Sequence, residues 1–394
     1  MAGQPVQMHR SASELHIYQK FDVGDTLGSG GFSVVYKARE LNSGEIVAIK
    51  VIDLARYSPS DTTLKREIDI LTKARHPNII QLRSVFFTEK SVFMVMEYAP
   101  GGELLARIRK QVRFPERQAA HIIKQLLGAV AYLHTCGVVH RDIKLENILL
   151  TSRRSIDVKL ADFGLSKCFE HEPLQTMCGS PQYVSPEVLA MAESRHGTVP
   201  AKAYTPAVDV WSAGVVLFML LSGYSPFDDD DDHKVFQKIR RGQCDVDDPI
   251  WKRISAPAKD LVAGMLMVNP KKRLTAQQAL EHPWLMFWER REATEAEQRA
   301  KAAPADTPKP PADAGAPSSK PRGEPRHIHA HSHSGGRAAS LEPTPQQTKA
   351  KEGEEAQAGN APKAPTADKA VQQRAEGVND AEAGQQRAHS KFNG

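Results

Sequence analysis

The chain has 394 residues, of which 40% are hydrophobic and 25% charged, so it is long enough and apolar enough to bury a sizeable core. Its formal net charge of +5 is small for this length and argues against a nucleic-acid partner. The four cysteines lie far apart without metal-ligand spacing, and no apolar run approaches the ~20 residues that span a bilayer, so we expect a cytoplasmic or nuclear protein without a membrane partner.

The composition divides the chain into three parts. Residues 1–20 are polar and predict a flexible N-terminal segment. Residues 21–290 carry regular apolar patterns and predict one folded domain, with a first lobe over about 21–100 and a second over about 101–290. Residues 291–394 are rich in alanine, proline, glutamine and glutamate, which predicts a disordered, low-complexity tail.

The folded part begins with strand patterns and continues with helix patterns. Three apolar, β-branched runs predict strands: residues 21–30, 32–40 and 45–54. Beyond Pro115 the apolar residues recur at a spacing of three and four, which predicts helices within residues 116–134, 208–223 and 257–267. We therefore expect an α+β fold, with a small β-rich first lobe that contains one key helix and a larger α-helical second lobe.

A glycine-rich turn, LGSGGFSVV, separates the first two predicted strands. Gly28 and Gly30 have no Cβ, so the backbone here could approach phosphate groups closely. A plain tight turn explains the same glycines equally well.

Lys50 and Glu67 both occupy positions where an apolar residue is expected. Lys50 alternates with apolar residues in the third predicted strand, and Glu67 lies at the edge of the apolar stripe of the following helix. Because burying either charge alone is costly, we expect the two side chains to pair. A purely structural ion pair would account for them equally well.

The segment VVHRDIKLENILL is more informative. It places Asp142, Lys144 and Asn147 between two short apolar runs, and Asp162 follows in LADFGLS. Asn147 and Asp162 offer the hard oxygen ligands that Mg²⁺ prefers, and Lys144 offers a positive charge for a transferred phosphoryl group.

The order of these motifs identifies a family. The glycine turn, AIK, HRD, DFG, an SPE segment and DVW follow one another over some 265 residues, and the chain resembles the eukaryotic protein kinases of the serine/threonine type. The resemblance implies the bilobal protein kinase fold. It also implies transfer of the γ-phosphoryl group of ATP, with Mg²⁺, to serine or threonine in protein substrates.

The resemblance also implies a role for each motif residue. Asp142 would accept or orient the proton of the substrate hydroxyl, Lys144 would contact the γ-phosphate, and Asn147 and Asp162 would bind Mg²⁺. Lys50, positioned by Glu67, would hold the α- and β-phosphates. The glycine turn, with Gly28 and Gly30, would cover the rest of the nucleotide. The adenine ring would lie between Leu27, Val35, Ala48 and Leu149, with Met96 as the gatekeeper and Glu97 to Ala99 as the hinge.

In this chain Ser33 replaces the third glycine of the turn, and this departure resembles the calcium/calmodulin-dependent kinase group. By this resemblance Ser180 would contact the substrate, and phosphorylation of Thr176, by an upstream kinase or by self in trans, would activate the chain through Arg141. Glu103 and Glu146 would select an arginine three residues before the substrate hydroxyl, although ordinary surface carboxylates explain them as well.

Two further expectations concern partners and alternatives. We do not expect calmodulin to bind, because the segment after Trp288 mixes charges and contains no second bulky apolar anchor. The main alternative is a catalytically silent pseudokinase scaffold, but none of the catalytic positions is replaced. Arg273 is expected to pair with Glu187 of the SPE segment, which favours a protein substrate over a small molecule.

Overall fold

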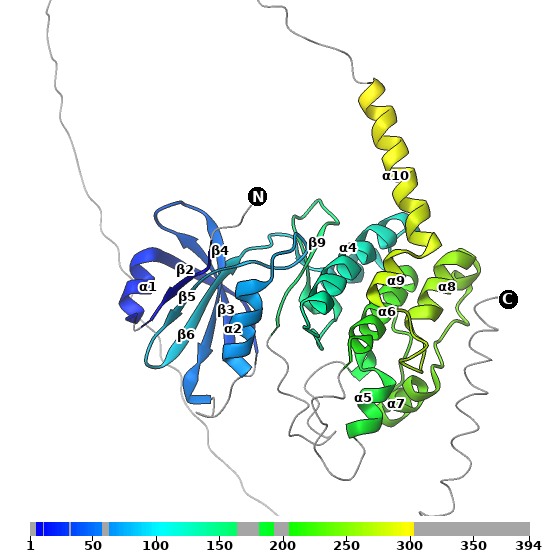
Figure 1. Ribbon diagram of the computed structural model, residues 1–394, viewed down its shortest axis with the longest axis horizontal. Helices are drawn as coiled ribbons and strands as arrows, with labels where there is room; N and C mark the ends of the chain where they lie inside the picture. The colour runs from blue at the N-terminus through cyan, green and yellow to red at the C-terminus, as the bar shows by residue number, and fades with distance from the viewer. Residues whose placement is uncertain are drawn as a thin grey trace, which may run out of the picture. The chain divides into compact units, whose positions relative to one another are not determined.

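The computed structural model describes residues 5–10, 12–30, 33–56, 63–163, 181–192 and 205–302, which form a β-rich lobe and a helical lobe (Figure 1). The first lobe is a six-stranded sheet with the order β1-β5-β6-β4-β3-β2. Five of its strands are antiparallel neighbours: β2 (Phe21–Ser29), β3 (Ser33–Glu40), β4 (Ile46–Asp53), β6 (Ser91–Glu97) and β5 (Leu82–Phe87). The bilobal fold predicted from the sequence is therefore confirmed.

The two faces of the sheet are covered by different helices. In β6, Phe93 and Val95 belong to the buried cluster that contains Ile17 of α1 (Glu14–Lys20). The alternating residues Val92 and Met94 pack instead with the cluster that contains α2 (Thr63–Lys73). The period of two along each strand thus assigns one face to α1 and the other to α2.

The N-terminal segment is ordered where the structure describes it. β1 (Gln7–His9) adds a parallel strand to β5, and the Ala12 backbone N–H donates to the Phe87 carbonyl over 2.9 Å. Ile17 is fully buried. The expectation of a flexible segment over residues 1–20 is therefore wrong for residues 5–10 and 12–20, because one strand and one apolar anchor fasten them to the sheet.

Ile17 gives a first testable prediction. We expect Ile17→Ala to lower the free energy of unfolding by about 2–5 kcal/mol, because it removes a buried side chain and leaves a cavity. Leu15→Ala is the control, since Leu15 on the same helix is 66% exposed. Urea unfolding of both variants measures the difference, and equal stabilities would contradict the packing of α1 on the sheet.

The second lobe is built around α6 (Ala207–Ser222), in which every residue from Val208 to Ser222 is buried. Helices and short 3₁₀ turns surround it: α3 (Leu104–Gln111), α4 (Glu116–Thr135), η2 (Leu145–Asn147), η4 (Pro181–Tyr183), α5 (Pro186–Ala192), α7 (Asp232–Arg241), η6 (Pro249–Lys252), α8 (Ala256–Met265), α9 (Ala276–Leu280) and α10 (Pro283–Ala302). A small sheet, β7 (Gly102–Glu103), β8 (Ile148–Leu150) and β9 (Val158–Leu160), lies beside the active-site loops. No helix among the described residues is both long and apolar enough to cross a membrane.

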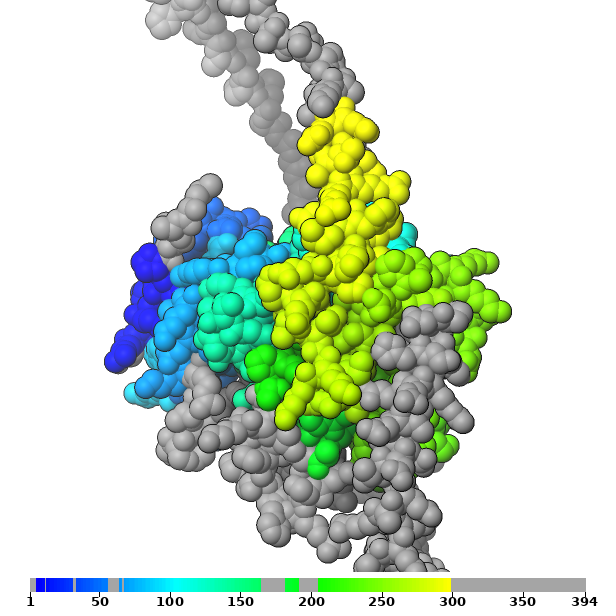
Figure 2. Space-filling view, turned by 45° about the vertical axis from the view of Figure 1, so that its right-hand side comes forward, coloured from blue at the N-terminus to red at the C-terminus, as the bar shows by residue number. Residues whose placement is uncertain are grey.

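α10 continues past residue 290, where the tail was expected to begin. Its charged side chains pair with α4: Glu289 with Lys124 over 2.6 Å and Glu295 with Arg117 over 2.8 Å. Figure 2 shows this part of the chain, in yellow, at the surface. The expectation of a disordered tail is therefore wrong for residues 291–302, because ion pairs hold this polar helix against α4; residues 303–394 lie outside the described residues.

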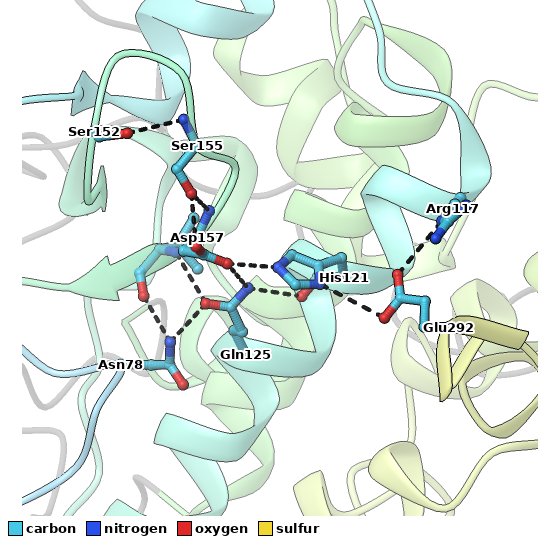
Figure 3. A network of polar contacts seen from close by, with 9 residues as sticks. Asn78, Arg117, His121, Gln125, Ser152, Ser155, Asp157 and Glu292 are labelled. Atoms are coloured by element: carbon cyan, nitrogen blue, oxygen red, sulfur yellow. Dashed lines mark hydrogen bonds and ion pairs between the residues drawn. The ribbon is translucent and has the colours of Figure 1, made fainter. Parts of the chain in front are cut away.

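A polar network runs from α10 through α4 to two loops, one just before β9 and one after α2 (Figure 3). His121 of α4 lies 2.7 Å from Asp157, just before β9, and 3.9 Å from Glu292 of α10. Gln125 of α4 accepts from Asn78, in the loop after α2, over 2.7 Å. The network therefore fixes the loop after α2 to the second lobe.

Candidate active site

Lys50, Glu67 and Asp162 meet in one cluster. The Lys50 Nζ atom lies 2.8 Å from Glu67 Oε1 and 2.9 Å from Asp162 Oδ1. Burial lowers the pKa of Lys50, but the charges of Glu67 and Asp162 outweigh it, and the pKa lies above its ordinary value. Lys50 therefore stays charged, and the pairing with Glu67 expected from the sequence is present.

Local structure explains how these three residues meet. The pleat of β4 turns Lys50 to the same face as Ala48, and Lys50 is 9% exposed. On α2, Glu67 lies three residues after Leu64, so both point into the core, and Glu67 is 4% exposed. Asp162 has a φ of 61°, a backbone conformation that few residues other than glycine adopt.

Asp142, Lys144 and Asn147 form a second cluster at η2. The Asn147 Nδ2 atom donates to the Asp142 carbonyl over 2.8 Å and to its carboxylate over 2.5 Å. The Lys144 Nζ atom lies 2.9 Å from the same carboxylate. Burial raises the pKa of Asp142, and the Lys144 charge works against this rise. One carboxylate is thus held in place by an amide and an ammonium group.

Asp209 was not singled out from the sequence, yet it supports this loop. It lies on α6, is 1% exposed, and accepts from the backbone N–H groups of His140 over 2.9 Å and Arg141 over 2.8 Å. The Nε2 atom of His134 lies 2.8 Å from the same Oδ2 atom of Asp209 that accepts from His140. Arg141 has a φ of 71°. The sequence does mark Asp209, because it stands inside the apolar run VDVWSAGVV, where a buried charge is tolerable only if it is hydrogen-bonded.

A cavity of about 510 Å³ lies between the glycine-rich turn and the small sheet. All residues predicted to hold the nucleotide line it, from Leu27, Gly28 and Gly30 through Val35, Ala48, Lys50 and Glu67 to Met96, Glu97, Ala99 and Leu149. Asp162 lines it as well, with Tyr98 of the predicted hinge, and Ile80 and Phe163 line it without having been predicted. Many of the lining residues are apolar, and Lys50, Glu67 and Asp162, which contact one another, form a charged part of the wall.

The residues predicted to bind substrate or regulate activity are only partly within the described chain. Glu103 is exposed and lines the same cavity. Glu146 lies on η2, and its Oε2 atom is buried without a hydrogen-bond partner among the described residues. Thr176 and Ser180 lie outside the described residues, so their roles remain predictions.

The ion pair of Lys50 gives a second prediction. We expect Glu67→Gln to lower kcat/KM by about 10- to 100-fold, because it removes a charged hydrogen bond worth about 1.5–3 kcal/mol. Asp69→Asn on the same helix is the control, since Asp69 is exposed. Steady-state kinetics over a range of ATP concentrations measures both, and an unchanged Glu67→Gln enzyme would show that the pair is only structural.

Comparisons with known proteins agree with this geometry. The protein kinase domain family matches residues 21–285. The "Probable serine/threonine-protein kinase fhkC" of Dictyostelium discoideum is 41% identical over 270 residues, which make up 68% of this chain and 44% of that protein. The "Calcium/calmodulin-dependent protein kinase type 1" of Caenorhabditis briggsae is also 41% identical, over 68% of this chain and 73% of that protein.

A solved structure is similar as well. The crystal structure of Rad53 residues 1–466 in complex with AMP-PNP matches with a TM-score of 0.58 and 32% identity, over 68% of this chain and 66% of that one. The chain thus spans less than half of the first relative and about three quarters of the second. By its family match and its relatives, the chain belongs to the protein kinase family, among the serine/threonine kinases that resemble the calcium/calmodulin-dependent kinases.

Proposed function

We propose that this chain transfers the γ-phosphoryl group of MgATP to serine or threonine hydroxyl groups of other proteins. The observation that carries the proposal is Lys50, which lies between Glu67 at 2.8 Å and Asp162 at 2.9 Å. We assign this activity to a kinase domain over residues 21–290, with lobes at about 21–100 and about 101–290.

The cavity fits a nucleotide. Apolar side chains on its two sides suit a flat adenine ring, and Gly28 has open space where a side chain would stand. The Asn147 amide nitrogen already donates to Asp142, so its oxygen remains as a ligand for a cation, beside the carboxylate of Asp162. When bound there, Mg²⁺ would neutralise the charge that develops on the phosphoryl oxygens.

In this proposal the protein's own groups position the reaction. Lys50, held by Glu67, binds phosphate oxygens as a fixed cation. Asp142 accepts the hydrogen bond of the substrate hydroxyl and turns the attacking oxygen toward the phosphorus. Lys144, 2.9 Å from that carboxylate, lies where it can stabilise negative charge on the transferred group.

We further propose a preference for arginine three residues before the substrate hydroxyl. The Oε2 atom of Glu146 supports it, because this atom is buried without a hydrogen-bond partner among the described residues, and an arriving arginine would donate that bond. Glu103, which is exposed and lines the cavity, is the second acidic group.

This preference gives a third prediction. We expect a serine peptide with that arginine to be phosphorylated at least about tenfold more efficiently than its alanine counterpart, and Glu146→Gln to abolish most of the difference. Glu89→Gln, on a turn of the first lobe, is the control variant. Equal kcat/KM for both peptides in the wild-type enzyme would contradict the preference.

Activation through Thr176 and independence from calmodulin complete the proposal. In this proposal a phosphate on Thr176 binds Arg141, next to the catalytic Asp142. We expect Thr176→Ala to have lower activity than the wild-type enzyme, and calcium/calmodulin to leave both unchanged. A calmodulin-dependent rate would overturn our reading of residues 289–302, and a wild-type rate in Thr176→Ala would exclude activation at this site.

A further inference from the structure

A second cavity, of about 1050 Å³, lies between the N-terminal segment and α2, apart from the nucleotide cavity. Its apolar lining includes Leu54, Leu64, Ile68, Phe87 and Val92. Three cations and three anions also face it: Arg10, Lys65 and Lys90, with Glu14, Asp69 and Glu89. The cavity therefore lies between the segment before residue 21, where the family match begins, and the helix that carries Glu67.

Ser13 lines this cavity at the start of α1. Its side chain is exposed and its backbone is extended, with φ −82° and ψ 153°. Arg10 stands three residues before it, which is the spacing that the proposed specificity selects. The Ser13 Oγ atom also accepts from the His16 backbone N–H over 3.3 Å and so caps α1. Ser13 thus combines an exposed side chain with an arginine three residues before it.

Two lysines from separate elements line the same cavity as Ser13. Lys65 lies on α2, two residues before Glu67, and Lys90 lies in the turn between β5 and β6. Within the described residues neither side chain forms an ion pair. A phosphoserine carries a charge of about −1.5 to −2 at neutral pH and offers three acceptor oxygens to such groups.

We propose that a second copy of this kinase phosphorylates Ser13, and that the phosphate then binds Lys65 and Lys90 and ties the N-terminal segment to α2. Ser13 Oγ forms a bond to the γ-phosphorus of ATP while the bond from that phosphorus to the bridging oxygen breaks. ADP leaves, and the hydroxyl proton passes to Asp142 of the acting copy and then to water. The tie holds Glu67 close to Lys50, since Lys65 and Glu67 share one helix turn.

The phosphorylation step rests on the proposed function, and the first experiment separates the two. Full-length protein is incubated with MgATP and an arginine-containing serine peptide, and phosphorylated sites are located by mass spectrometry. We expect phosphate on Ser13 in the wild type, in Ser11→Ala, and in Asp142→Asn protein mixed with wild type. Arg10→Ala should be labelled about tenfold more slowly, while it phosphorylates the peptide normally.

Ser340 in GRAASLEP supplies an internal comparison, because Arg337 stands three residues before it. Labelling of the peptide and Ser340 without Ser13 would overturn the inference and leave the proposed function intact. Labelling of nothing would contradict the proposed function itself.

The second experiment tests the tie without any kinase activity. Phosphoserine is placed at position 13 of Asp142→Asn protein during synthesis, and hydrogen exchange is followed in α1 and α2. We expect exchange in α2 to slow about tenfold relative to unmodified protein, as for one added charge-assisted hydrogen bond. The Lys65→Ala/Lys90→Ala variant should lose this protection, whereas Lys73→Ala, which does not line the cavity, should keep it. Protection that is absent, or that survives the double substitution, would overturn the tie.

Discussion

Asp142→Asn should lower kcat by about 10²–10⁴-fold while KM for ATP changes little, because the variant keeps the shape of the side chain and loses the acceptor for the hydroxyl proton. Asn147 and Lys144 both contact the Asp142 carboxylate, at 2.5 and 2.9 Å, so the substitution also removes the charge that orders them. The measurement is the initial rate of peptide phosphorylation at saturating ATP.

The control for this prediction is Asp260→Asn, which makes the same chemical change at a side chain that is 63% exposed in the second lobe. It should retain the wild-type rate. Thermal unfolding of both variants shows whether they remain folded. A folded Asp142→Asn enzyme within about twofold of wild type would show that no proton acceptor at this position is needed.

Arg273→Ala should destabilise the second lobe by about 3–5 kcal/mol, because it leaves the nearly buried Glu187 carboxylate without the cation that it pairs with. The Arg273 side chain is fully buried and forms two bonds to Glu187, of 2.7 and 2.9 Å. It also donates to the carbonyls of Ala207 and Met267 and lies over the Trp211 ring. For a domain of this size the loss corresponds to a fall in Tm of about 10 °C.

Arg241→Ala, at an exposed arginine of α7, is the matched control and should unfold like the wild type. Arg273→Lys separates charge from geometry: one ammonium group cannot form the paired bonds, so most of the loss should remain. A lysine variant as stable as the wild type would show that charge alone is required. The pairing of Arg273 with Glu187 was expected from the sequence and is confirmed.

Residues whose meaning is local could be predicted from the sequence. The period of two in β4 and the spacing of three and four in α2 both assign an inward position to a charged residue, and only pairing makes this tolerable. Lys50 and Glu67 therefore followed from pattern and physics. The residues of the nucleotide cavity followed from the ordered motifs of the family, which a single sequence displays directly.

Residues whose meaning depends on distant contacts could not be predicted in this way. α1 has seven residues, which is too short to be stable alone, and it forms because Ile17 packs on the sheet. α10 continues beyond residue 290 because acids on it meet bases on α4, more than 160 residues earlier. Asp209 received no role because its partners, in the loop at residues 140–141, are 68 and 69 residues away in sequence.

The most direct test of the central claim is a rate measurement with ATP labelled at the γ-phosphate. The full-length enzyme, with Thr176 shown to be phosphorylated, is given Mg²⁺ and two peptides that differ only in serine or tyrosine at one position. We predict label on the serine peptide, none on the tyrosine peptide, and loss of labelling in Lys50→Met. No transfer to serine under these conditions, or transfer to tyrosine, would contradict the account.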